Sequence, residues 1–142
     1  MIFSNDRSAL RRTFQTAWQK RVEGKPLEPL EVIIADVVAL HPEYQRIVEQ
    51  PEALDRDWSP AMGETNPFLH MGMHIALHEQ LTTRRPAGIN EAYAAALVKL
   101  GDPHTVEHRF MECLGEALWQ AQRNGAPPDE AGYLRCLQAI TQ

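Results

Sequence analysis

Apolar residues recur along this chain at intervals of three and four, which is the period of an amphipathic helix. No stretch alternates with the period of two that is typical of a half-buried strand. The first apolar stripe consists of Leu10, Phe14, Ala17, Trp18 and Val22. Asn5 or Asp6 is the expected N-cap of this helix, and Gly24 and Pro26 are expected to end it.

The same period predicts five more helices, over residues 29–41, 67–83, 90–100, 103–125 and 128–140. Asn66 and Asp102 are predicted N-caps, and a proline follows each at the first helical position. "EYQRIVEQ" after Pro42 is expected to form a short turn of its own, and residues 51–66 form the longest irregular stretch. The pattern predicts an all-α protein: a single helical domain over residues 1–142, built as a bundle of five to six helices.

The segment "LEVIIADVVALH" is apolar almost all round and predicts the most buried helix. Asp36 interrupts it. Its carboxylate therefore needs a partner or a position at a hydrated edge.

The overall charge excludes some partners. Lys and Arg number 14 against 19 Asp and Glu, and the net charge of -5 argues against non-specific binding to nucleic acid or anionic lipid. The basic residues Arg11, Arg12, Lys20 and Arg21 are expected to form a solvated helix face. No apolar run is long enough to span a membrane, and the first residues do not have the pattern of a signal peptide.

The two cysteines give an expectation about location. Cys113 and Cys136 both lie in helical patterns, and the chain has no CxxC motif. We expect reduced thiols in a cytoplasmic protein.

Histidines are the residues with the clearest potential for chemistry. "HMGMHIALH" places His70, His74 and His78 at intervals of four, and His104 and His108 repeat this spacing. Residues four apart share one face of a helix, so two imidazoles at this spacing can bind one metal ion.

The positions of these pairs along their helices predict that they meet. His70 and His74 lie four and eight residues after Asn66, while His104 and His108 lie two and six residues after Asp102. Short connections make successive helices antiparallel, so the helices over 67–83 and 103–125 should be parallel and begin at the same pole of the bundle.

The end of the 29–41 helix should reach this pole as well. The predicted metal ligands are His70, His74, His104, His108, Glu112 and His41. His78 lies deeper in its helix, and whether it takes part is left open.

A donor set rich in histidine and poor in carboxylate favours zinc, iron or nickel over magnesium or calcium, with zinc or iron first. "HTVEH" matches the H-x-x-E-H signature of inverted zinc peptidases, although the chain lacks the larger α/β domain of those enzymes. Glu107 lies between His104 and His108 in this motif. It is the candidate catalytic base, or else a hydrogen-bond partner of one of the metal ligands.

Three functions follow from such a site. A metal ion with an open position could serve an enzyme of unknown substrate. Four protein ligands would make the metal structural, in a non-catalytic binding or scaffold protein. Without a metal, the histidines would form a buried hydrogen-bonded cluster. The sequence does not decide whether the protein is an enzyme, identifies no small-molecule or protein partner, and leaves a homodimer open.

The segments "LHPEYQ", "NPFLHMGMHIALHEQ", "RRPAGI", "HTVEHRFMECLGEALWQAQRNG" and "PPDEAGYLRCL" carry a family resemblance. In this order and spacing the chain resembles, over nearly its whole length, a proteobacterial family catalogued as domain of unknown function 1841. The resemblance implies a small cytoplasmic helical protein and supplies no activity. The family pattern has the pairs His70/His74 and His104/His108 followed by Glu112. It often has histidine where this chain has Gln45, and usually another residue at His78.

Overall fold

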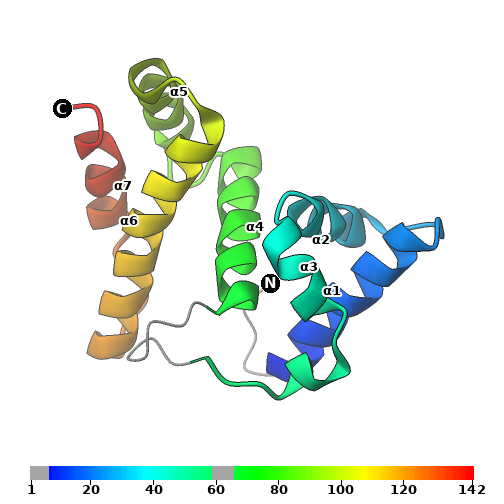
Figure 1. The fold of residues 1–142 in the computed structure, drawn as a ribbon. Helices are drawn as coiled ribbons and strands as arrows, with labels where there is room; N and C mark the ends of the chain where they lie inside the picture. Colours follow the sequence, from blue (N-terminus) through cyan, green and yellow to red (C-terminus); the bar gives the residue numbers. More distant parts are fainter. Residues whose placement is uncertain (1–6, 59–65) are drawn as a thin grey trace. The chain divides into compact units, whose positions relative to one another are not determined.

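The computed structural model describes residues 7–58 and 66–142, which form seven α-helices, one short 3-10 helix and no strand (Figure 1). The helices are α1 (Arg7–Val22), α2 (Pro29–Ala39), α3 (Pro42–Val48), η1 (Pro51–Leu54), α4 (Pro67–Thr83), α5 (Ile89–Leu100), α6 (Pro103–Asn124) and α7 (Glu130–Ala139). The all-α class is confirmed. The predicted number of five to six is too low because α3, expected as a turn, is a full α-helix. The predicted N-caps Asn5 and Asp6 lie outside the described residues.

The chain divides into two compact units, residues 1–75 and 76–142, with the boundary inside α4. Unit 1 contains α1, α2, α3, η1 and the first part of α4. Unit 2 contains the rest of α4 with α5, α6 and α7. A single domain over residues 1–142 stays a prediction.

In unit 1, α1 and α2 are joined by two ion pairs. Lys20 Nζ lies 2.9 Å from a Glu31 carboxylate oxygen, and Arg21 Nη2 lies 2.8 Å from Asp36 Oδ1. Asp36 therefore has the partner that its position required. The backbone N–H of Glu28 also donates to Glu31, and this bond, followed by the one from Lys20, lowers the pKa of Glu31.

The expectation that α2 is the most buried helix was wrong, because a larger share of α4 is buried. The buried side chains of α2 are Ile34, Ala35 and Val38, whereas Leu30 and Val32 are exposed. A short helix at the edge of a small unit has too few neighbours to cover every face.

Arg11 also departs from expectation, because it is buried, with 2% of its surface exposed, and does not lie on a solvated face. Its Nη1 donates to the carbonyl oxygens of Ala53 at 2.9 Å, Leu54 at 3.3 Å and Arg56 at 2.7 Å. These bonds satisfy carbonyls at the end of η1 and fix this segment against α1. Burial lowers the pKa of Arg11.

The same guanidinium lies against two aromatic rings. It is 5.0 Å from the ring centroid of Trp58 and 5.1 Å from that of Phe68, and the two rings meet edge to face. Phe68 also packs edge-on against Phe14 of α1. Arg11 therefore links α1, η1 and the first turn of α4.

In unit 2, α7 packs against α5 and α6, and its side chains Tyr133 and Leu137 are buried. Tyr133 donates its hydroxyl to Gln80 Oε1 at 2.7 Å, and burial raises the pKa of this phenol. Figure 1 shows that α6 and α7 run antiparallel. This return of the chain brings Cys113 and Cys136 together in a disulfide, with 5.8 Å between their Cα atoms. The expectation of reduced thiols was therefore wrong. The spacing of the two cysteines along the sequence did not reveal that they meet in the folded chain.

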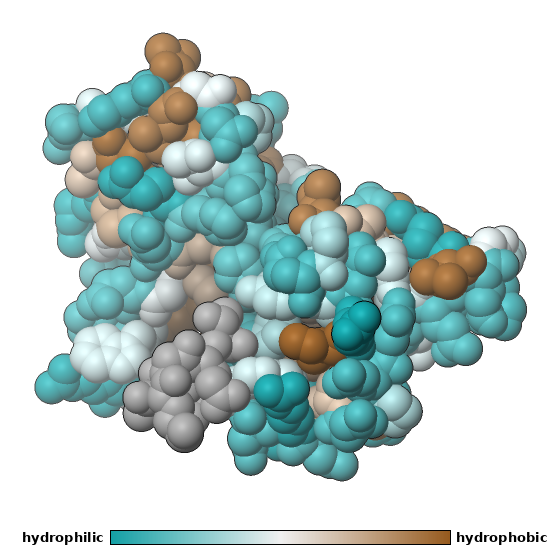
Figure 2. Space-filling model, viewed as in Figure 1, coloured by the Kyte–Doolittle hydropathy of each residue, from teal (hydrophilic) through white to brown (hydrophobic). Residues whose placement is uncertain are grey.

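The face visible in Figure 2 is mostly hydrophilic, with smaller apolar areas between the polar side chains. Among the described residues, no helix has the length and apolar character needed to cross a membrane.

Replacing Arg11 by Met should lower the free energy of unfolding by about 2–4 kcal/mol, because three carbonyl acceptors lose a charged donor. Urea unfolding of the purified protein measures this loss. In Arg11→Lys the charge is kept, but the ammonium group reaches fewer acceptors. The stability of this variant should therefore lie between those of Arg11→Met and the unsubstituted protein. Equal stability of Arg11→Met and the unsubstituted protein would contradict the role given to Arg11.

Candidate metal centre

His41 occupies the junction between α2 and α3. The ring of Pro42 disfavours helical backbone at the preceding residue, and His41 accordingly has φ -123° and ψ 72°. Its backbone N–H donates to Val38, and its carbonyl oxygen accepts from the N–H of Tyr44. Its ring is tied as well, because Nδ1 lies 2.8 Å from the carbonyl oxygen of Val37. Only 4% of the residue is exposed.

His70 and His74 lie on the first part of α4. Asn66 caps this helix, since its side-chain oxygen accepts from the backbone N–H groups of Phe68 at 3.0 Å and Leu69 at 3.2 Å. Pro67, at the first helical position, has no N–H that would need a partner. His74 is buried and His70 is half-buried. The predicted cap is thus confirmed, and it sets where the histidine pair lies along the helix.

These three histidines meet in unit 1. Their ring centroids are 5.3 Å apart for His41 and His70, 4.8 Å for His41 and His74, and 5.0 Å for His70 and His74. One nitrogen from each ring lies within 4.8 Å of the others. Among the described residues, this is the group of three or more potential ligands that the structure brings together.

An aromatic side chain that sequence reasoning missed completes the cluster. Tyr44 stacks on His41 with ring centroids 5.5 Å apart and planes at 9°, and it meets the edge of His70 at 5.8 Å. Burial, and then the charge of Glu43, raise the pKa of Tyr44. The position of Tyr44, one helical turn after His41, was the available signal. Apolar side chains of the unit 1 core, including Met71 and Ile75, lie next to the histidines along α4.

Unit 2 holds the second predicted pair. His104 is exposed and His108 is half-buried, and their ring centroids are 4.1 Å apart on α6. Glu112 is exposed, with one oxygen 3.9 Å from Nε of Arg109, and Glu107 is half-buried. The predicted meeting of this pair with His70 and His74 would join the two units and stays a prediction. So do the ligand role of Glu112 and the catalytic role of Glu107.

The structure shows where the two departures from the family pattern, His78 and Gln45, lie. His78 is exposed on α4 and lies outside the group of three. Gln45 donates from its side-chain amide to the carbonyl oxygens of Val38 at 3.3 Å and Ala39 at 3.4 Å. Gln45 therefore satisfies carbonyls at the end of α2, immediately before His41.

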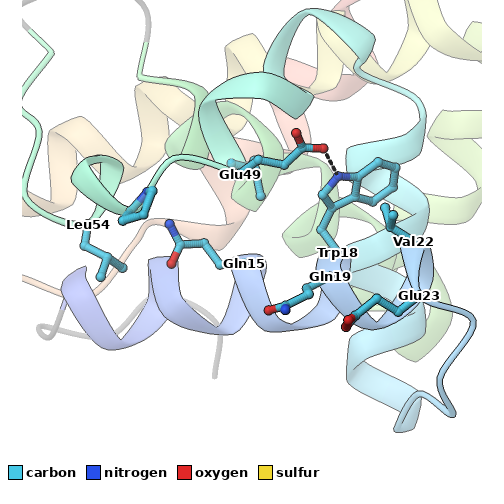
Figure 3. A pocket seen from close by; sticks show the side chains of 9 residues that line it. Gln15, Trp18, Gln19, Val22, Glu23, Glu49 and Leu54 are labelled. Carbon is cyan, nitrogen blue, oxygen red and sulfur yellow. Dashed lines mark hydrogen bonds between the residues drawn. The ribbon is translucent and has the colours of Figure 1, made fainter.

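A separate cavity of about 480 Å³ lies in unit 1 between α1 and the segment from α3 to η1 (Figure 3). None of the histidines lines it. Trp18 crosses one side and donates from Nε1 to Glu49 Oε1 at 2.9 Å, as the dashed line in Figure 3 shows. The histidine cluster is therefore separate from this cavity and belongs to the core of unit 1.

Fold and site together define a small helical protein with a buried histidine cluster. The family model described as a domain of unknown function (DUF1841) matches residues 6–139, so the chain belongs to this family. No curated protein and no solved structure matches the chain. The family assignment confirms the resemblance and adds no activity, so the proposed chemistry depends on the geometry of the residues.

The N-cap of α6 gives a pH-dependent prediction. Thr105 donates its hydroxyl and its backbone N–H to the Asp102 carboxylate, and these bonds lower the pKa of Asp102. Because the folded pKa is the lower one, the ionised carboxylate stabilises the fold fully above the ordinary Asp value of about 3.9. This contribution is lost as the pH falls through the lowered value. Asp102→Ala should therefore lower Tm at neutral pH, and the difference should shrink as the solution is acidified.

Thermal unfolding of both proteins between neutral and acidic pH measures this difference. Asp102→Asn keeps an acceptor oxygen and should lose less stability than Asp102→Ala. A difference between Asp102→Ala and the unsubstituted protein that stays constant across the pH range would show that the charge of Asp102 has no part in the cap.

Proposed function

We propose that unit 1 binds a transition-metal ion through His41, His70 and His74. The observation that carries this proposal is the group itself: three imidazoles from two separate chain segments, with ligand atoms within 4.8 Å of one another. Two of the three are buried, with 4% of His41 and 6% of His74 exposed. Imidazole nitrogens are common ligands of zinc and other transition metals.

The hydrogen bond of His41 supports a ligand role. A carbonyl oxygen can only accept, so Nδ1 of His41 carries the proton that it donates to Val37. In the neutral ring Nε2 then has the lone pair. Metal-binding histidines usually donate their other ring N–H to a carbonyl or carboxylate in this way, which fixes the tautomer and orients the ring.

The dipoles of α2 and α4 act in opposite directions on a cation here, because His70 lies near the N-terminal, positive end of α4. Val37 and Val38 belong to the last turn of α2, where carbonyl oxygens carry the negative end of the helix dipole. Three neutral imidazoles favour zinc, iron(II) or nickel over magnesium or calcium. A tetrahedral ion with metal–nitrogen bonds of about 2.1 Å holds its nitrogens about 3.4 Å apart. Binding would therefore draw the rings inward from their present separation.

Three histidine ligands leave one tetrahedral position for a water molecule or a substrate atom. A metal ion in such a site lowers the pKa of bound water and can polarise a carbonyl or phosphoryl oxygen. A metal-dependent enzyme is therefore the function we favour. A ligand from the His104/His108 pair, as predicted from the sequence, would instead fill the open position and make the metal structural.

Metal binding can be tested on α4 with a matched pair of variants. The untagged protein, stripped of metal, should take up about one equivalent of Co²⁺ or Zn²⁺. His70→Ala should weaken this binding on the order of 100-fold, because one ligand is lost. His78→Ala removes an exposed histidine from the same helix and should bind like the unsubstituted protein. Elemental mass spectrometry and Co²⁺ absorption titration measure the uptake and the geometry.

Uptake below about a tenth of an equivalent after reconstitution would overturn the proposal. Equal losses in His70→Ala and His78→Ala would do the same. Either result would favour the metal-free alternative, in which the stacked and edge-to-face contacts of the rings stabilise the core. Far-UV circular dichroism of both variants checks that they are folded.

A second measurement distinguishes an open site from a closed one. Azide should change the absorption spectrum of the Co²⁺-loaded protein if a coordination position is open, because the anion can replace bound water. Three protein ligands predict this change. An unresponsive spectrum that becomes azide-sensitive in the double variant His104→Ala/His108→Ala would assign the fourth ligand to α6 and the metal to a structural role.

A further inference from the structure

The disulfide of unit 2 has two unlike ends. Cys113 on α6 has 6% of its surface exposed, whereas Cys136 on α7 is exposed. Thiol–disulfide exchange requires a thiolate to reach one sulfur while the other leaves. Access therefore favours attack at Cys136, with Cys113 as the leaving group.

A cavity of about 300 Å³ lies beside this bond, and both cysteines line it. Its other lining side chains include Gln120, Asn124 and Asp129, which offer amide and carboxylate groups for hydrogen bonds. A small thiol with amide and amino groups can form hydrogen bonds with these side chains, although most of the surface that lines the cavity is apolar. Arg135, next to Cys136 in sequence, places a cation near the exposed end, with Nη2 4.0 Å from Asp129.

Helix α7 is held in unit 2 by contacts that do not involve the disulfide. Leu137 is fully buried, and Tyr133 is buried with its hydroxyl bonded to Gln80. Lys99 of α5 donates from Nζ to the carbonyl oxygen of Ile140 at 2.9 Å. Breaking the sulfur–sulfur bond therefore leaves α7 anchored, as reversible exchange in the folded protein requires.

We propose that Cys136 is a site of thiol–disulfide exchange with low-molecular-weight thiols. A thiolate attacks Cys136 Sγ, a mixed disulfide forms there, and the bond to Cys113 breaks. Cys113 takes the electron pair as a thiolate and is protonated from solvent. A second thiolate attacks the small-molecule sulfur of the mixed disulfide and releases Cys136 as a thiolate. Two thiols are oxidised to one small disulfide, and the protein disulfide is reduced to two cysteines.

Reduced glutathione is the probe for the first step. The oxidised protein is incubated with reduced glutathione in the presence of EDTA. The reaction is quenched with iodoacetamide and mapped by peptide mass spectrometry. Glutathione should be found on Cys136 and the alkyl group on Cys113. Glutathione mainly on Cys113, or reduction only in denaturant, would overturn the proposal.

Single serine variants provide a matched control. Cys113→Ser keeps the exposed thiol and should form the mixed disulfide with oxidised glutathione at least ~10-fold faster than Cys136→Ser, which keeps the buried one. Circular dichroism checks that both are folded, and the trapping experiment stands if either is not. Equal rates in two folded variants would contradict the assignment. A purified protein with two free thiols that do not pair under oxidised glutathione would refute the disulfide itself.

Discussion

The buried guanidinium of Arg11 is the interaction on which the arrangement of unit 1 depends. It donates to carbonyls of the η1 segment and lies against Trp58 and Phe68. Phe68 belongs to the first turn of α4, the helix that carries His70 and His74. A charged group in this position needs all of its partners, because an uncompensated buried charge costs several kcal/mol. The start of α4 is thereby fixed to α1, and the histidines take their place in the core.

The histidine cluster combines two different ways of positioning a side chain. His70 and His74 are placed by helix periodicity after a capped start, and small shifts of α4 would move them together. His41 is placed by a proline-determined junction and a hydrogen bond from its own ring. Two rigid supports of different origin hold three imidazoles in one buried group. Such preorganisation lowers the cost of binding an ion, because little order has to be gained on binding.

The two units carry different chemistry. Unit 1 offers neutral nitrogen donors in an apolar core, which suits a metal ion. Unit 2 holds a sulfur–sulfur bond with one exposed end beside a cavity, which suits exchange with a thiol. Each proposal depends on residues of one unit alone, so each can succeed or fail without the other.

The sequence by itself determined the α-helices other than α3 and the candidate ligands on α4, because both follow from local periodicity and capping. Asn66 and Asp102 cap the helices predicted for them, and the pattern of period four gave His70 and His74. His41 was placed near them by counting antiparallel helices. The tertiary structure alone decided the burial of Arg11, the stacking of Tyr44 on His41 and the pairing of Cys113 with Cys136. Each of these joins residues that are not neighbours on one helix, and only the packing of separate segments determines which side chains meet. The sequence could name residues able to bind a metal ion, while the distance between them is a property of the folded chain.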